Sequence, residues 1–105
     1  MNHLQNLMQD RPARPVPPGE VISDILDELG MTVASFAKIL DVPHQTVSKI
    51  IQGREPITVD MAIRLGKALG NGPQLWLNLQ QKIDVWDALQ KHREEYEKVL
   101  TVAWA

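Results

Sequence analysis

The segment from Thr32 to Gly53, TVASFAKILDVPHQTVSKIIQG, constrains the fold of this 105-residue chain more than any other. Its spacing predicts two short helices joined by a tight turn. A small residue falls where the two helices would cross, and apolar residues fall where the second helix would anchor against the first: Ala37, Val42, Val47 and Ile50. The pattern favours a helix-turn-helix. The competing interpretation is an ordinary helical hairpin, because it shows similar spacing.

The outer face of the second helix is polar and carries no acid; its members are His44, Gln45, Ser48, Lys49 and Gln52. Such a surface suits the major groove of DNA, where base edges offer donors and acceptors on a polyanion. We expect base contacts from His44, Gln45 and Lys49. Contacts with phosphate and sugar, which set the register without reading sequence, are expected from Thr46, Ser48, Gln52 and Arg54. The alternative for each residue is a solvated helix face.

The net charge of −2 argues against nucleic acid if it is taken alone. The distribution of charge matters more, because physiological salt screens charges beyond about 8 Å. The first predicted helix carries four acids and no base, whereas residues 42–54 carry Lys49 and Arg54 and no acid. We therefore expect DNA binding with limited non-specific affinity.

Composition excludes several other classes of protein. The chain has no cysteine, so disulfides and thiolate metal sites are excluded. Residues 1–17 lack the basic start and apolar core of a secretory signal, and no run of about 18 apolar residues occurs. The expected compartment is the cytoplasm.

Enzymatic function is not indicated. His3, His44 and His92 are scattered without metal-ligand spacing, and no glycine-rich phosphate loop is present. Asp84 and Asp87 could be imagined as a carboxylate pair, but charges on an exposed helix are usually solvated. We expect no catalytic residue, no metal and no cofactor.

Three regions are expected: a flexible N-terminal tail with a Pro-rich connector over residues 1–17, a helix-turn-helix DNA-binding domain over 18–82, and a C-terminal helical extension over 83–105. The tail is either simply mobile or an arm that orders on contact with a partner. The fold class is all-α with five helices. Helices are expected to start at Pro18, after the caps Thr32 and Thr58, and at Gly72 and Pro73. They are expected to stop at Gly30, Gly53 and Gly70.

Apolar stripes predict which helix faces are buried. The stripe of the first helix contains Val21, Ile22, Ile25, Leu26 and Leu29, and that of the second contains Phe36, Ala37, Ile39 and Leu40. Gly66 lies inside the fourth helix, where we expect it to permit close helix approach. Asp60 and Arg64 on that helix are four residues apart in the favourable acid-first order.

The stripe of the last helix is too long for four short helices to cover; it runs through Leu75, Trp76, Leu79, Ile83, Trp86, Leu89, Tyr96 and Leu100. We expect its near half, Leu75 to Leu79, to be core. For Ile83, Trp86, Leu89 and Tyr96 we favour a two-fold dimer interface over folding back on the same domain.

Five segments of the sequence carry a family pattern in one order: PGE (18–20), the core of residues 37–50, IIQGREPIT (50–58), DMAIRLGKALG (60–70) and LWLNLQ (75–80). Together they resemble the HigA (VapI/HigA) family of bacterial antitoxins. That family is a branch of the Xre/Cro-like helix-turn-helix proteins. The resemblance covers residues 18–89. It implies a lambda-repressor-like domain that dimerises on a pseudo-palindromic operator, represses its own operon and neutralises a HigB-like toxin of the RelE-like class of mRNA interferases.

Two residues depart from the family pattern. Asp41 stands where the turn usually has Gly, and Pro43 stands where a Ser or Thr cap is common. Asp tolerates left-handed backbone and Pro is accepted in a first helical turn, so the fold should survive both changes. The missing cap costs about 1 kcal/mol in typical hosts, which should weaken operator binding.

Two other functions remain open. One is a stand-alone Xre-family transcriptional repressor. The other is a protein-binding helical module without DNA affinity, which the low net charge and the missing cap make credible.

Overall fold

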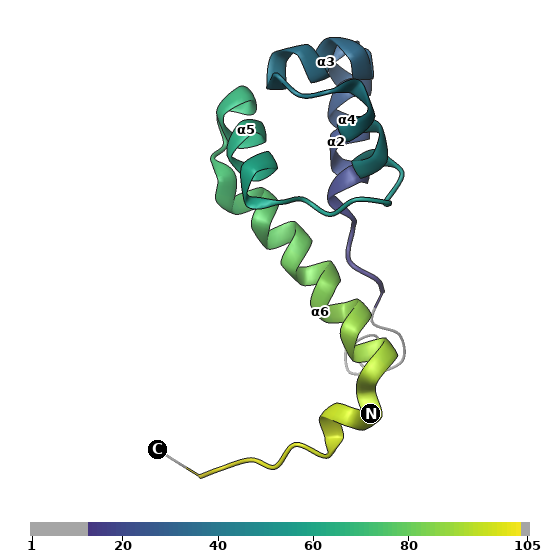
Figure 1. Cartoon of the computed structure of the whole chain (residues 1–105), viewed down its shortest axis with the longest axis vertical. Helices are drawn as coiled ribbons and strands as arrows, with labels where there is room; N and C mark the ends of the chain where they lie inside the picture. Colours follow the sequence, from purple (N-terminus) through teal and green to yellow (C-terminus); the bar gives the residue numbers. More distant parts are fainter. Residues whose placement is uncertain (1–12, 104–105) are drawn as a thin grey trace, which may run out of the picture.

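The computed structural model describes residues 13–103, and within that range it contains five helices and no strand. The helices are α2 (Pro18–Leu29), α3 (Val33–Leu40), α4 (His44–Ile51), α5 (Val59–Leu69) and α6 (Pro73–Glu97). Figure 1 shows the first four grouped at one end, with α6 running away from them. The predicted all-α, five-helix fold is confirmed. Residues 1–12, assigned to the tail, and 104–105 lie outside the described residues.

The helix ends follow local chemistry, as predicted. The Thr32 hydroxyl accepts a hydrogen bond from the Ser35 backbone N–H at 3.1 Å, and the Thr58 hydroxyl accepts one from the Met61 N–H at 3.1 Å. Each bond satisfies an N–H group that has no partner within its helix. The predicted glycine stops also adopt left-handed backbone conformations, at Gly30, Gly53 and Gly70.

One apolar core joins all five helices. Trp76 lies fully buried in this core. The other buried side chains of the core are Ile22, Leu26, Phe36, Ala37, Leu40, Val47, Ile50, Ile57, Met61, Ala62 and Leu65. The Trp76 indole N–H donates to the Asn71 side-chain oxygen at 3.3 Å, and the Gln80 side-chain oxygen accepts from the Ile57 N–H at 2.8 Å. Both bonds fasten α6 to the loops beside it.

Three predicted core residues are exposed instead. Leu29, Ile39 and Leu75 are 55%, 57% and 42% exposed, so their assignment to the core was wrong. The spacing of apolar residues gives the face of a helix on which each one lies, but it does not give how far the neighbouring helices extend over that face. Short helices such as α3 cover only a narrow stripe.

Two glycines allow backbones to approach closely. A Cβ atom on Gly66 would overlap the backbone of Gly72, whose N–H donates to the Gly66 carbonyl at 3.2 Å. Close approach at Gly66 is therefore confirmed. A Cβ on Gly19 would overlap the backbone of Ile50 in the same way, which brings the start of α2 against the end of α4. The apolar and glycine patterns of the sequence do not predict this second contact.

Helix α6 continues past the expected domain boundary at residues 82 and 83, and its one non-helical residue is His92 (φ −122°, ψ 26°). Ile83 is only 5% exposed and is covered by its own chain, so its expected part in a dimer interface does not hold. Beyond Ile83 no residue of α6 is buried. None of the helices in residues 13–103 has the length and apolarity needed to cross a membrane.

Candidate nucleic-acid interface

Helix α4 presents one face to the core and one face outward. Val47 and Ile50 are 1% and 3% exposed and anchor the helix, while Val42 in the preceding turn is partly buried against the same core. The predicted base-contacting residues His44, Gln45 and Lys49 are all exposed. Of the residues predicted to contact phosphate and sugar, Gln52 and Arg54 are exposed, whereas Thr46 and Ser48 are half-buried. The predicted division of α4 into an inner and an outer face is therefore observed.

The turn before α4 has the unusual backbone that the sequence suggested. Asp41 adopts the left-handed conformation, with φ 58° and ψ 49°. Pro43 occupies the N-cap position of α4 and provides no side-chain hydrogen bond to the helix. The exposed first turn of α4 therefore lacks the cap that a Ser or Thr would supply.

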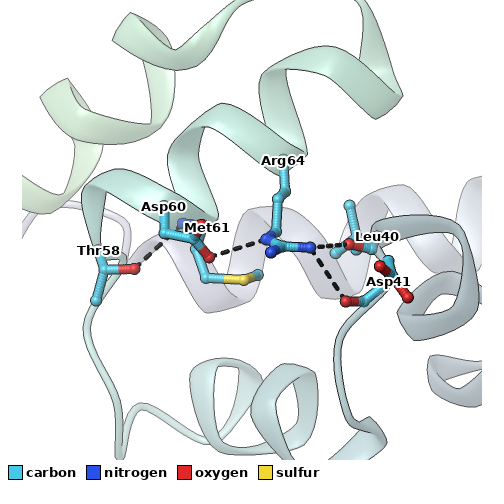
Figure 2. Close-up of polar contacts among 6 residues, drawn as sticks. All are labelled: Leu40, Asp41, Thr58, Asp60, Met61 and Arg64. Carbon is cyan, nitrogen blue, oxygen red and sulfur yellow. Dashed lines mark hydrogen bonds and ion pairs between the residues drawn. The ribbon is translucent and has the colours of Figure 1, made fainter.

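A side chain from outside the motif secures this turn. Arg64 of α5 donates from Nη1 to the carbonyl oxygens of Leu40 and Asp41, at 2.9 and 3.0 Å (Figure 2). Its Nε donates to the Asp60 carboxylate at 2.8 Å, which confirms the expected i,i+4 pair. The sequence predicts neither of the two carbonyl contacts, because no spacing rule connects Arg64 with a turn more than twenty residues earlier.

The far end of α4 closes in a tight turn. Gly53 has φ 77°, and the Arg54 N–H donates to the Lys49 carbonyl at 2.8 Å. These features form a C-terminal cap in which left-handed glycine reverses the chain. Arg54 therefore follows directly after the helix, at the edge of its exposed face.

A groove of about 430 Å³ runs between α4 and the start of α5. Its lining includes Gln45 and Lys49 from α4 and Thr58 and Asp60 from the start of α5. Glu55 also lines it, so the groove contains two acids and one lysine. This mixed charge fits the low non-specific affinity expected from the sequence.

The described part of the chain contains no group of three or more His, Cys, Asp or Glu residues that could hold a metal ion. Asp84 and Asp87 do not form a pair with each other. Asp84 accepts a hydrogen bond from the Gln80 amide at 2.9 Å, and Asp87 pairs with Arg14. The Asp87 side chain remains about half exposed, so its ion pair lies at the surface of α6.

Comparison with known proteins identifies the family. The helix-turn-helix family matches residues 22–76, more than half of the chain. Antitoxin HigA-1 of Vibrio cholerae is 38% identical over 89 residues, which span 84% of each chain.

Solved structures agree with this match. A protein of Nostoc punctiforme, assigned as the antidote of a plasmid maintenance system, is 64% identical; the match covers 87% of this chain and 100% of that one, with a TM-score of 0.77. The Pseudomonas aeruginosa antitoxin HigA, solved with the higBA promoter, is 32% identical over 86% of this chain and 100% of that one, with a TM-score of 0.80. The chain therefore belongs to the HigA antitoxin family, a branch of the Xre-type helix-turn-helix DNA-binding proteins.

Proposed function

We propose that this protein is the antitoxin of a HigBA-type type II toxin-antitoxin module, and that it represses the operon encoding it. The observation that carries the proposal is the exposed polar face of α4, anchored on a core shared with a HigA antitoxin that was solved with its promoter. The family is a DNA-binding family and not an enzyme family. Any nuclease activity of the module would belong to a RelE-like toxin partner.

Sequence would be read by the N-terminal part of α4. Gln45 has the paired donor and acceptor that match adenine, and Lys49 donates to the acceptors of guanine. His44 stands at the first position of α4 and is also exposed. The proposed contacts with phosphate and sugar come from Thr46, Ser48, Gln52 and Arg54. In this arrangement the half-buried Thr46 and Ser48 set the depth of α4 in the groove, because their short side chains keep the backbone close to the DNA.

A second copy of the chain is the proposed occupant of the apolar face of α6. This face has a groove of about 420 Å³, lined by Pro15, Gln81, Lys82, Val85, Trp86 and Leu89. Val85, Leu89 and Tyr96 remain 52%, 43% and 45% exposed. Exposed apolar patches of this kind mark interaction sites. A two-fold dimer through Trp86, Leu89 and Tyr96 would present two copies of α4 to half-sites about 34 Å apart on a pseudo-palindromic operator.

Two experiments test the proposed function. The first is co-expression of the protein with the neighbouring reading frame, followed by purification through a tag on one partner. Copurification of a small basic protein whose toxicity is suppressed supports the antitoxin role. If no such protein copurifies and the chain still binds the operator, the result would indicate a stand-alone repressor.

The second experiment is a band-shift titration with the intergenic DNA upstream of this reading frame. Specific binding that weakens steeply with salt supports autorepression, because contacts with phosphates release counterions. No binding even at low salt would contradict it and would leave a protein-binding helical module.

A further inference from the structure

Arg64 of α5 bonds the end of α3 and the turn before α4, although it lies outside the helix-turn-helix. We propose that Arg64 is a positioning residue: it holds the turn between α3 and α4 in place and thereby sets the orientation of α4 against DNA. The inference deepens the proposed function and rests on it for the DNA readout.

The contacts of Arg64 are directional. Nη1 donates to the carbonyl oxygens of Leu40 and Asp41 at 2.9 and 3.0 Å, and Nε donates to the Asp60 carboxylate at 2.8 Å. Figure 2 shows the guanidinium lying between the carboxylate on one side and the two carbonyls on the other. The Arg64 side chain is 35% exposed, so the contacts are partly sheltered from water. Asp60, on the preceding turn of α5, fixes the orientation of the Arg64 guanidinium.

The carbonyls at this place need an outside donor. Leu40 ends α3, and the last carbonyl groups of a helix have no partner within it. The same end of a helix carries partial negative charge, which a cation stabilises. A guanidinium presents several N–H donors in one plane and remains charged, so it can serve a carboxylate and two carbonyls together.

The local restraints of the turn close the end of α3 but give α4 no side-chain cap. Asp41 adopts φ 58°, a conformation that residues with a Cβ rarely adopt. Backbone bonds from Asp41 N–H to the Lys38 carbonyl (3.2 Å) and from Val42 N–H to the Ala37 carbonyl (3.1 Å) close the end of α3. Pro43 then offers no cap to α4. Arg64 therefore supplies, from α5, a restraint that the local sequence of the turn lacks.

The restraint also sets the relation between α4 and α5. Val42 and Lys49 line one side of the 430 Å³ groove, and Thr58 and Asp60 line the side formed by α5. Because Arg64 bonds the turn at one end and Asp60 at the other, its loss would allow α4 to shift relative to α5. A shift of this kind would weaken base readout more than phosphate contact, since base contacts depend more on exact placement.

The test compares Arg64→Met with Lys67→Met. Both remove one positive charge from α5, and Lys67 is an exposed residue on the same helix. Affinity is measured for a duplex of the upstream intergenic DNA and for a random duplex of equal length, after circular dichroism has shown that the variants are folded. Arg64→Met should weaken binding of the intergenic duplex about tenfold, in line with the coupling found within hydrogen-bond networks, and should affect the random duplex less. Equal losses for Arg64→Met and Lys67→Met would overturn the proposal.

A further variant separates positioning from the effect of charge. Arg64→Lys keeps the charge but has no planar fork, and it should lose part of the affinity for the intergenic duplex. Unchanged affinity for that duplex would show that the two carbonyl contacts do not orient α4.

Amide hydrogen exchange tests, without DNA, whether Arg64 holds the turn between α3 and α4. In Arg64→Lys the amides of Asp41 and Val42 should exchange about tenfold faster than in the wild type, while those of α6 stay unchanged. If the wild-type protein binds no DNA, the proposed function fails, but this exchange result still shows whether Arg64 holds the turn. Unchanged exchange at both amides would show that Arg64 does not hold the turn, even where DNA binding is intact.

Discussion

Arg14 forms a two-pronged ion pair with Asp87, across 73 residues of sequence. Its Nε and Nη2 donate to the two carboxylate oxygens at 3.0 and 2.9 Å. The hydrogen bond lowers the pKa of Asp87 and raises the pKa of Arg14. The pair ties the Pro-rich connector to α6, and Figure 1 shows the segment before α2 descending beside that helix. The connector is thus part of the folded structure from at least residue 14.

The first prediction concerns the pH dependence of this pair. A carboxyl group whose pKa is lowered on folding stabilises the protein above its ordinary pKa of 3.8, and this contribution is lost as pH falls through the lowered value. Asp87→Asn should therefore lower Tm slightly at pH 7, and the difference from wild type should vanish well below pH 3.8. The effect should also shrink in high salt, because both side chains are about half exposed.

Thermal unfolding followed by circular dichroism at pH 7 and at low pH provides the measurement. Asp24→Asn, which removes an exposed carboxylate from α2, is the control for charge alone. The same Tm difference for Asp87→Asn at both pH values would contradict the assigned role of the pair.

The second prediction separates base from phosphate contacts. Lys49→Ala should weaken binding of the intergenic duplex by about 1 to 3 kcal/mol and relax base preference, because we propose that Lys49 donates to base edges. Arg54→Ala should weaken all sequences alike and reduce the slope of log K against log salt by about 1. Fluorescence anisotropy at several salt concentrations measures both. Equal losses on specific and random DNA for Lys49→Ala would refute the division.

The third prediction concerns the contact at Gly66. Gly66→Ala should lower the free energy of unfolding by about 1 to 3 kcal/mol, since the added methyl meets the backbone of Gly72, which cannot move aside as a side chain can. The change runs against the higher helix propensity of alanine. Urea denaturation measures the loss, and Lys67→Ala on the same helix should stay within about 0.5 kcal/mol. Unchanged stability for Gly66→Ala would show that the helices can separate without cost.

The fourth prediction tests the dimer. Leu89→Glu places a charge in the apolar groove of α6, where its burial against a second copy would be unfavourable. The mass measured by light scattering should fall from that of two chains to that of one. Val99→Glu is the matched control, because Val99 is 72% exposed and lies beyond the end of α6. A wild-type protein that is monomeric at micromolar concentration would rule out the proposed interface.

Much of the fold could be predicted because its determinants are local. The hydroxyls of Thr32 and Thr58 find their partners three residues away, and Gly30 and Gly70 reverse the chain by their own backbone freedom. Asp41 adopts the left-handed backbone at the position where the turn of the family usually has Gly. Signals of this kind are complete within one turn of helix, so the sequence displays them.

The apolar pattern was a weaker guide to burial. It placed Val47 and Ile50 correctly, but it also placed Ile39 in the core and Ile83 in a partner interface. All four lie on apolar stripes. Which of them are covered depends on the length and angle of the neighbouring helices, and a one-dimensional spacing does not contain that information.

By itself the sequence determined the helix-turn-helix, the ends of its helices, the outward polar face of α4 and the family. Only the tertiary structure decided that Arg64 secures the turn before α4, that Arg14 anchors the connector to Asp87, and that Gly19 meets the end of α4. The physical reason is distance along the chain. These partners lie 23 to 73 residues apart, and their contact exists only after the core has brought the helices together.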